Sequence, residues 1–192
     1  MRRKVKALLL LFFLLPVVPL KVSYLRLTYY DYKYTTPIQE GKLPNEVLDS
    51  SLNGNSDCPV EVKNGLILLM KNEDVIKSIQ VNLSRDFSGE GQCLIHNETL
   101  YVAVVGERGI VGIEGLYKDI DIVYHLQNRY VWAFDLGSGK VDWYYHEIKG
   151  CRTGGGCYPF DPQVKLQNGK LYVSFSPYEG RTLVFNPYSE KK

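Results

Sequence analysis

The stretch from Tyr130 to Tyr145, YVWAFDLGSGKVDWYY, decides the fold class. Two short runs rich in aromatic and β-branched residues flank the polar segment Leu136–Lys140, which contains two glycines. Aromatic and β-branched residues favour strands, and glycine adopts the positive φ angles that tight turns need. The stretch therefore predicts a β-hairpin.

Three other segments share one outline, in which a turn led by asparagine comes directly before an apolar strand. Asparagine tolerates the left-handed backbone of such turns. The first and third copies stay parallel beyond the turn, because residues 78–82 match residues 182–186 at a constant offset of 104. This internal repeat predicts an all-β domain of antiparallel strands. The three copies span residues 63–69, 96–102 and 167–173.

The repeat resembles that of pyrroloquinoline-quinone-type (PQQ-type) β-propellers, which belong to the quinoprotein alcohol dehydrogenase-like superfamily. The resemblance covers residues 58–192, and only the copy that contains the opening hairpin is complete. It implies that the indole of Trp143 packs against a neighbouring blade and that three residues fix the turn, namely Asp135, Ser138 and Gly139.

The resemblance implies about three blades, in an open or partial ring. Propellers usually have four to eight blades, and repeats of about 40–45 residues leave room for only three or four here. A reduced four-blade form, an open sheet assembly and a partial array completed by a partner are the options, and the open or partial array is preferred. The chain ends before the last blade has an outer strand. We expect residues 24–34 to supply it by pairing with Leu171–Phe185, because tyrosines alternate with charged residues at period two over residues 30–34.

Composition excludes several classes of protein. The chain has 192 residues, enough for one domain with a sizeable core or two very small ones. A hydrophobic content of 45% excludes a disordered chain. The first six residues hold four of the 23 basic residues, so the remainder carries 19 basic and 21 acidic residues. This nearly neutral body, with no further cluster of lysine and arginine, predicts no nucleic-acid partner.

The N-terminus predicts the compartment. The basic start is followed by an apolar run of 14 residues, 7–20, which fits an export signal and is shorter than the ~20 residues of a membrane-spanning helix. Export is favoured over a buried core helix. No small-x-small cleavage site follows, so a cleaved signal peptide and a retained membrane anchor both stay open. The expected organisation is a signal or anchor (1–20), a lead-in strand and linker (21–57), and the propeller-like domain (58–192).

The four cysteines agree with an extracytoplasmic location. An even number in an exported chain favours two disulfides. We expect Cys151 to join Cys157, since the five residues between them close a small flexible loop. This leaves Cys58 to join Cys93. The alternatives are reduced thiols and a zinc site, and zinc is disfavoured because the chain lacks a Cys-x₂-Cys pair.

The glycine-rich segment 106–129 interrupts the second repeat and predicts an inserted β-hairpin or long loop. Long loops on rigid scaffolds often carry function, and a loop with no role is the alternative. We expect the contact surface to combine this insertion with the disulfide loop 151–157, since tyrosine and arginine are frequent in binding hot spots. The candidate partner-binding residues are Arg152, Tyr158, Tyr117 and His125. Asn82 and Asn97 begin glycosylation sequons.

Residue spacing gives no catalytic or cofactor prediction. The three histidines, His96, His125 and His146, lack metal-ligand spacing. A Gly-x-Ser-x-Gly elbow is missing from the chain, and the glycines at 154–156 are not followed by the lysine of a phosphate-binding loop. The vicinal cysteine pair of quinoprotein dehydrogenases is missing too.

The sequence therefore predicts an exported or membrane-tethered, non-catalytic binding or scaffold module that binds a protein partner or associates with itself. The alternatives are a quinone- or carbohydrate-processing enzyme and a degenerate fragment of a longer propeller.

Overall fold

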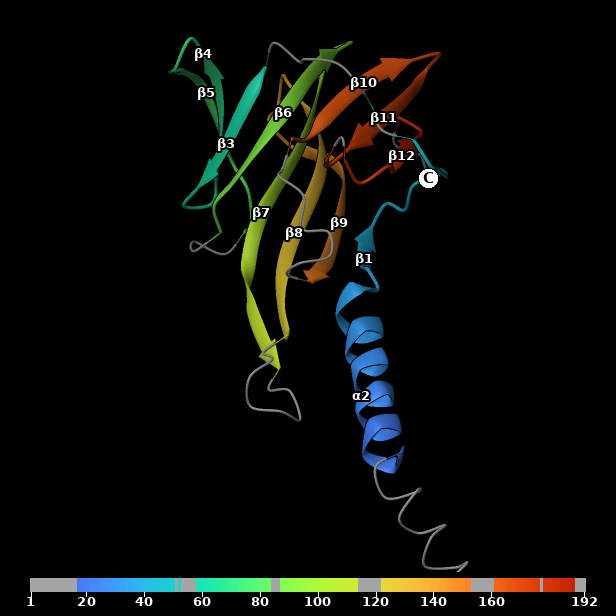
Figure 1. Ribbon diagram of the computed structural model, residues 1–192. Coiled ribbons are helices and arrows are strands. Elements are labelled where there is room, and N and C mark those ends of the chain that lie inside the picture. The colour runs from blue at the N-terminus through green and yellow to red at the C-terminus, as the bar shows by residue number, and fades with distance from the viewer. Residues whose placement is uncertain are drawn as a thin grey trace, which may run out of the picture.

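The computed structural model describes residues 17–50, 52, 58–83, 87–113, 122–152, 161–176 and 178–188. These residues form one helix and two antiparallel sheets (Figure 1). The larger sheet has the strand order β1-β9-β8-β7-β6-β3-β4-β5, and the smaller one β10-β11-β12-β2. The predicted all-β class is therefore confirmed. The elements are α2 (Val17–Thr35), β1 (Ile38–Gly41), β2 (Glu46–Leu48), β3 (Pro59–Lys63), β4 (Leu66–Lys71), β5 (Asp74–Gln80), β6 (Gly89–His96), β7 (Thr99–Ile113), β8 (Ile122–Asp135), β9 (Val141–Arg152), β10 (Gln163–Gln167), β11 (Lys170–Ser174) and β12 (Thr182–Phe185).

The three repeats begin with the same kind of hairpin. Asparagine leads the two-residue turns between β3 and β4, between β6 and β7, and between β10 and β11. Both turn residues have positive φ in each case, which is the conformation that suits the right-handed twist of the flanking strands. The repeated asparagine-led turns are thus confirmed. The turn residues are Asn64 and Gly65, Asn97 and Glu98, and Asn168 and Gly169.

Strand β7 lies at the centre of the molecule, since every residue from Leu100 to Val105 is buried. Its alternate side chains enter two different hydrophobic clusters. One cluster joins β3–β5 to β6–β8 on a single face of the curved larger sheet. The other fills the space between β7–β9 and the smaller sheet. The two clusters make β7 the common wall of both cores.

A disulfide ties the start of β3 to β6. Cys58 and Cys93 are joined as predicted, with their Cα atoms 5.1 Å apart. The backbone amide of Cys93 also donates a hydrogen bond to the carbonyl of Cys58, at 2.8 Å. The link therefore reinforces the pairing of β3 with β6, which joins the first repeat to the second in one sheet.

The strand expected over residues 24–34 is wrong, because these residues lie in the helix α2. The side chains that face the sheet are Leu27, Tyr30 and Asp31, which are three and four residues apart. This is the spacing of one helix face. Packing of that face against Tyr124 therefore outweighs the period-two alternation of the tyrosines.

The smaller sheet nevertheless takes its last strand from the N-terminal part of the chain. Val47 on β2 pairs with Leu183 on β12 in an antiparallel register. The side-chain oxygen of Asn45 accepts a hydrogen bond from the backbone amide of Asn186, at 2.7 Å. The segment 21–57 thus contributes a strand to each sheet, since β1 pairs with β9 on the larger one. The expected pairing of residues 24–34 with the last repeat is therefore wrong, and residues 46–48 form the strand that pairs with β12.

The first 16 residues of the apolar and basic N-terminal segment lie outside the described part of the chain, and residues 17–20 begin α2. Within the described residues, no helix is long and apolar enough to cross a membrane.

Replacing Leu100 by alanine tests the central place of β7. The side chain is fully buried, so we expect the free energy of unfolding to fall by about 2–5 kcal/mol. Its cross-strand partner Ile95 is 56% exposed, and Ile95→Ala should change the stability by less than about 0.5 kcal/mol. Urea unfolding of the two variants measures both values. Similar losses for the two would contradict a core centred on β7.

Candidate partner-binding surface

The segment predicted as an insertion is the outer half of a long hairpin. Residues 106–113 of β7 pair with residues 122–128 of β8 in continuation of the main ladder. The register shifts between Glu107 and Gly109, where Gly109 has a φ of 147°. A bulge of this kind bends and twists a strand pair. The hairpin extends beyond the part of the sheet that the smaller sheet covers (Figure 1).

Helix α2 covers one face of this hairpin. Tyr124 is fully buried, and its hydroxyl donates a hydrogen bond to the carboxylate of Asp31. Leu27, Tyr30 and Val111 pack around the same ring. The hairpin is therefore held against the helix by an apolar contact with one polar bond at its centre.

The opposite face of the hairpin carries an exposed apolar side chain. Ile110 pairs with His125 across the two strands, next to the pair Val111 and Tyr124, so the two pairs lie on opposite faces. The side chain of Ile110 is 61% exposed. His125 Nδ1 lies 3.1 Å from a carboxylate oxygen of Glu107, which forms a charged pair when the imidazole is protonated. This face thus combines an exposed apolar residue with charged neighbours.

The base of the hairpin contains a buried network of charges. Arg129 and Glu147 are direct cross-strand partners on β8 and β9, and their nearest side-chain atoms are 3.4 Å apart. Arg129 also lies 2.8 Å from Glu179, which Lys149 contacts as well. Arg181 reaches Glu147 at 2.7 Å. The network therefore connects β8 and β9 to the loop between β11 and β12.

Neutral side chains complete the network. Gln127 accepts a hydrogen bond from Arg129 at 2.9 Å, and Gln39 on β1 donates to the Tyr145 hydroxyl at 3.0 Å. The guanidinium of Arg129 lies 5.4 Å from the ring centre of Phe175. Every charge in this interior site thus has hydrogen-bonding or aromatic partners, which is what burial of charge requires.

The pKa values in the network show that opposite charges outweigh burial. Burial raises the pKa of the Glu179 carboxyl, but Arg129 and Lys149 together bring it below its usual value. Burial lowers the pKa of the Arg181 guanidinium, and Glu147 more than reverses this. Burial, followed by the nearby Glu147 carboxylate, raises the pKa of Tyr145. All three groups are therefore fixed in their usual charge states at neutral pH.

This network was not predicted from the sequence, although the alternation of inward- and outward-facing residues along β8 indicates it. Gln127 and Arg129 are in phase with Val131 and Ala133, which face the second core. Polar residues in the phase of a buried face predict an internal polar site. They also show that the base of the segment 106–129 belongs to the core, and that only its outer part is an appendage.

The second half of the expected contact surface adjoins the hairpin. Cys151 pairs with His125, and Arg152 with Tyr124, in the ladder between β8 and β9. Cys151 is disulfide-bonded, and its sulfur is 3.5 Å from the amide nitrogen of Gln127. The structure therefore brings the start of loop 151–157 next to the hairpin. Cys157, Tyr158, Tyr117 and the side chain of Arg152 lie outside the described residues, so the pairing of Cys151 with Cys157 stays a prediction.

The turn residues of the opening hairpin bond to one another. Asp135 accepts hydrogen bonds from the backbone amide and the hydroxyl of Ser138, at 2.6 and 2.7 Å. The backbone bond, followed by the hydroxyl bond, lowers the pKa of the Asp135 carboxyl. Gly139 has a φ of 70°, and its amide donates to the Asp135 carbonyl. These three residues therefore form the turn and leave no side chain for binding.

Trp143 connects the two sheets. Its indole nitrogen donates a hydrogen bond to the carbonyl of Pro187 at 3.1 Å, and its ring stacks on Phe185 with the ring centres 5.5 Å apart. Phe185 lies on β12 and Pro187 follows that strand, so the indole packs against the third repeat. Of the two sequon asparagines, Asn97 lies in a turn and Asn82 just after β5, and both are exposed.

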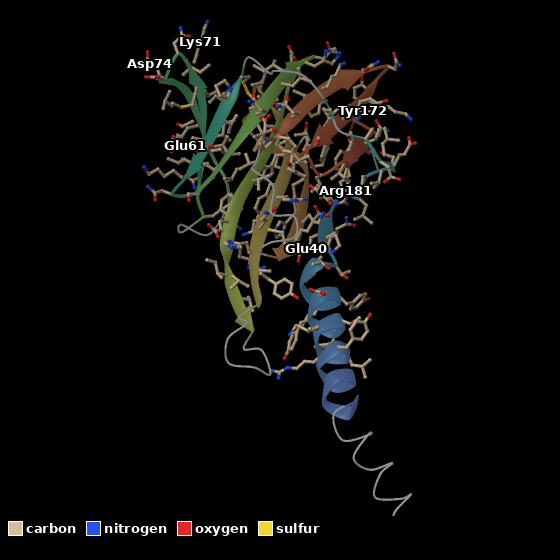
Figure 2. The ribbon with its side chains drawn as sticks, viewed as in Figure 1. Glu40, Glu61, Lys71, Asp74, Tyr172 and Arg181 are labelled. Carbon is tan, nitrogen blue, oxygen red and sulfur yellow. A yellow bond between two sulfur atoms is a disulfide. The ribbon has the colours of Figure 1, made fainter. Side chains whose placement is uncertain are left out.

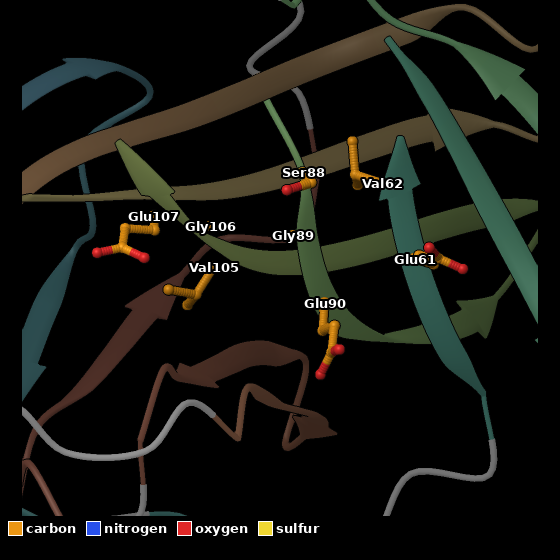
Figure 3. A pocket seen from close by; sticks show the side chains of 8 residues that line it. All are labelled: Glu61, Val62, Ser88, Gly89, Glu90, Val105, Gly106 and Glu107. Atoms are coloured by element: carbon orange, nitrogen blue, oxygen red, sulfur yellow. The ribbon is translucent and has the colours of Figure 1, made fainter. Parts of the chain in front are cut away.

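An acidic hollow lies on β3, β6 and β7 (Figure 3). It has a volume of about 380 Å³, and a second hollow of about 300 Å³ lies beside it. Glu61 and Glu90 line both hollows and are direct cross-strand partners. Within the described residues, no group of three or more potential metal-binding side chains is close enough to hold an ion. The hollows are therefore acidic surface features of the sheet.

His146 is enclosed where β1 meets β9. Its ring stacks on Tyr130 with the centres 4.2 Å apart, and Nε2 is 3.1 Å from the side-chain oxygen of Asn128. Nδ1 lies 3.6 Å from a carboxylate oxygen of Glu40. Burial lowers the pKa of the imidazole, and Glu40 opposes this only in part.

The comparisons with known proteins were negative. No family model, curated protein or solved structure matches the chain. The similarity to PQQ-type repeats therefore depends on the residues quoted above.

Replacing Glu147 by glutamine tests the buried network. The change keeps the shape of the side chain but removes the counter-charge of Arg129 and Arg181. We therefore expect the free energy of unfolding to fall by about 3–5 kcal/mol. The matched control is Glu46→Gln. Glu46 lies 3.8 Å from Lys170 with both side chains about half exposed, and its loss should cost about 0–1 kcal/mol. Urea unfolding gives both values, and equal small losses would contradict the network.

Replacing His146 by glutamine tests the pH dependence. Because the folded pKa lies below the unfolded value of about 6.5, the unfolded chain binds a proton first as the pH falls. The contribution of His146 to stability is therefore present above about pH 6.5 and is lost below it. We expect urea unfolding between pH 7.5 and pH 5 to show a smaller loss of stability for His146→Gln than for the parent protein. An unchanged slope in His146→Gln would refute the assignment.

Proposed function

We propose that the protein is a non-catalytic binding or scaffold module, exported or tethered outside the cytoplasm, which holds its partner through the β7–β8 hairpin. The single observation behind this proposal is the hairpin itself, with one face fixed on α2 and the other exposed. The partner is a protein, either a second copy of the chain or a different one.

The construction of the hairpin favours binding. Its base is held by the buried charges around Arg129, and its middle by the contact between Tyr124 and α2. A segment that is already rigid loses little conformational entropy when a partner binds. Ile110 and Arg108 are both exposed and lie two residues apart on β7, and arginine is enriched in binding hot spots.

We also propose that the two sheets consist of blade-like units. Strands β3–β5, β6–β9 and β10–β12 with β2 are three antiparallel meanders, each opened by an asparagine-led turn. We interpret them as three blade-like units of an open array related to the PQQ-type repeat. The residues of that repeat are used in turns and packing, as Asp135 and Trp143 illustrate, so the repeat supports a scaffold and adds no catalytic group.

The disulfide supports the location outside the cytoplasm. The bond between Cys58 and Cys93 connects two strands of the core, and such structural disulfides persist in oxidising compartments. The basic start and apolar run of the first 20 residues agree with export.

A charge on the hairpin should abolish partner capture. Ile110→Asp places a carboxylate on the exposed face without touching the core, and Ile95→Asp makes the same change at the other end of β6 and β7, where Ile95 is 56% exposed. We expect cross-linking of the native full-length protein, followed by mass spectrometry, to show one specific protein contact at the hairpin. Ile110→Asp should weaken that contact by about ten-fold or more, which corresponds to about 1.4 kcal/mol, while Ile95→Asp retains it.

The same pair of variants identifies self-association. A dimer seen by sedimentation that Ile110→Asp dissociates and Ile95→Asp does not would support the proposal with a second copy as the partner. Capture that survives Ile110→Asp, or that depends equally on Ile95, would contradict it.

A further inference from the structure

A stripe of exposed tyrosine and leucine side chains follows the free side of α2. Leu25, Tyr29 and Tyr32 are 66%, 58% and 70% exposed, and their spacing of four and three residues places them on one helix face. Tyr24, at 70% exposure, lies beside this stripe. The opposite helix face holds Leu27, Tyr30 and Asp31, which pack against the hairpin (below, the four exposed residues are called the tyrosine stripe).

The helix is continuous with the apolar N-terminal run. Residues 7–20 contain no charge, and the last four of them form the start of α2. The same helix then passes through residues 20 and 21 and docks on the β domain by Leu27 and Tyr30. A helix that passes through this boundary, together with the lack of a small-x-small site, favours retention of the segment.

The length of the apolar run places the tyrosine stripe at a membrane boundary. A helix of 14 residues, the length of the apolar run, would rise about 21 Å, whereas the hydrocarbon core of a bilayer is about 30 Å thick. The missing length corresponds to about six more residues, which brings Tyr24 and Leu25 to the edge of the hydrocarbon. Tyr29 and Tyr32 then follow within about two further turns. Arg26 is exposed and has a long side chain that can extend toward the headgroups.

We propose that the apolar run is retained as a membrane anchor and that the tyrosine stripe of α2 lies in the headgroup layer of the bilayer. Tyrosine is enriched at that depth because its ring is apolar and its hydroxyl reaches water or headgroups. This inference rests on the proposed location outside the cytoplasm, but not on the hairpin as a binding site.

The proposal also orients the β domain. Val111 and Tyr124 contact α2 at Leu27 and Tyr30, one to two turns after the start of the stripe. The outer end of the hairpin and the start of α2 point in the same direction (Figure 1). The hairpin end is therefore close to the membrane, and the smaller sheet is at the far side. A partner held by the hairpin would then be a membrane protein or lie at the membrane surface.

Fluorescence quenching in vesicles tests the depth of the stripe. The full chain is reconstituted in phosphatidylcholine vesicles that carry bromine near the glycerol end of the acyl chains. Tyr29→Trp introduces a reporter on the stripe, and Tyr172→Trp is the matched control, since Figure 2 shows Tyr172 on the side of the domain away from α2. The native Trp132 and Trp143 are 5% and 8% exposed in the cores, so they give a constant background.

We expect bromine to quench the Tyr29→Trp reporter and to leave Tyr172→Trp at the level of the parent protein. Tyr32→Trp serves as a second reporter if Tyr29→Trp lowers the stability in urea. Two reporters with no quenching, or equal quenching at residue 172, would overturn the proposal.

The mass of the native protein tests retention of the anchor. Protein purified from the membranes of expressing cells should keep residues 1–20, and an N-terminus at or beyond residue 21 would refute the anchor. These results are independent of partner capture. Quenching without a hairpin-dependent partner would therefore reject only the proposed function, and a hairpin-dependent partner without quenching would reject only the membrane contact.

Discussion

The burial of β7 on both faces is the constraint on which the rest of the structure depends. A strand with a core on each side needs apolar residues at every position, and residues 100–105 satisfy this. One core requires the larger sheet to curve until β4 and β5 share a cluster with Trp132 and Phe134. The other core requires a second sheet, which the third repeat and β2 supply. Curvature and layering thus follow from the two-sided burial of β7, which its neighbour β8 shares at residues 131–134.

Beyond the two cores, ion pairs replace apolar contacts between the strands. The side chain of Arg129 on β8 lies on the same strand face as Val131 and Ala133, but it contacts Glu147 instead of an apolar side chain. A buried ion pair contributes little net stability once the loss of hydration is counted, whereas it requires a defined geometry. Contacts to Glu179 and Arg181 extend that geometry to the smaller sheet. The network therefore links the base of the hairpin to the loop between β11 and β12.

The sequence allowed prediction of features set by local chemistry. The asparagine-led turns, the turn built by Asp135 and Ser138, and the strand class follow from backbone preferences within a few residues. The pairing of Cys58 with Cys93 followed by elimination, once the small loop had suggested that Cys151 joins Cys157. The helical state of residues 24–34 and the network around Arg129 depend on contacts between distant segments, such as Tyr124 with Asp31 over 93 residues. Local periodicity contains no information on such contacts.

The two faces of α2 explain why its sequence misled a period-two argument. Five tyrosines occur between residues 24 and 34. Of these, Tyr30 packs on the hairpin, whereas Tyr24, Tyr29 and Tyr32 are exposed. The exposed positions of α2 mix Leu25, Tyr29 and Tyr32 with Arg26, Thr28 and Lys33, so its amphipathic signal is weak. Tyrosine suits both packed and exposed positions, because its ring packs and its hydroxyl bonds. The property of tyrosine that misled the period-two argument thus also supports the proposed position of the helix at a membrane boundary.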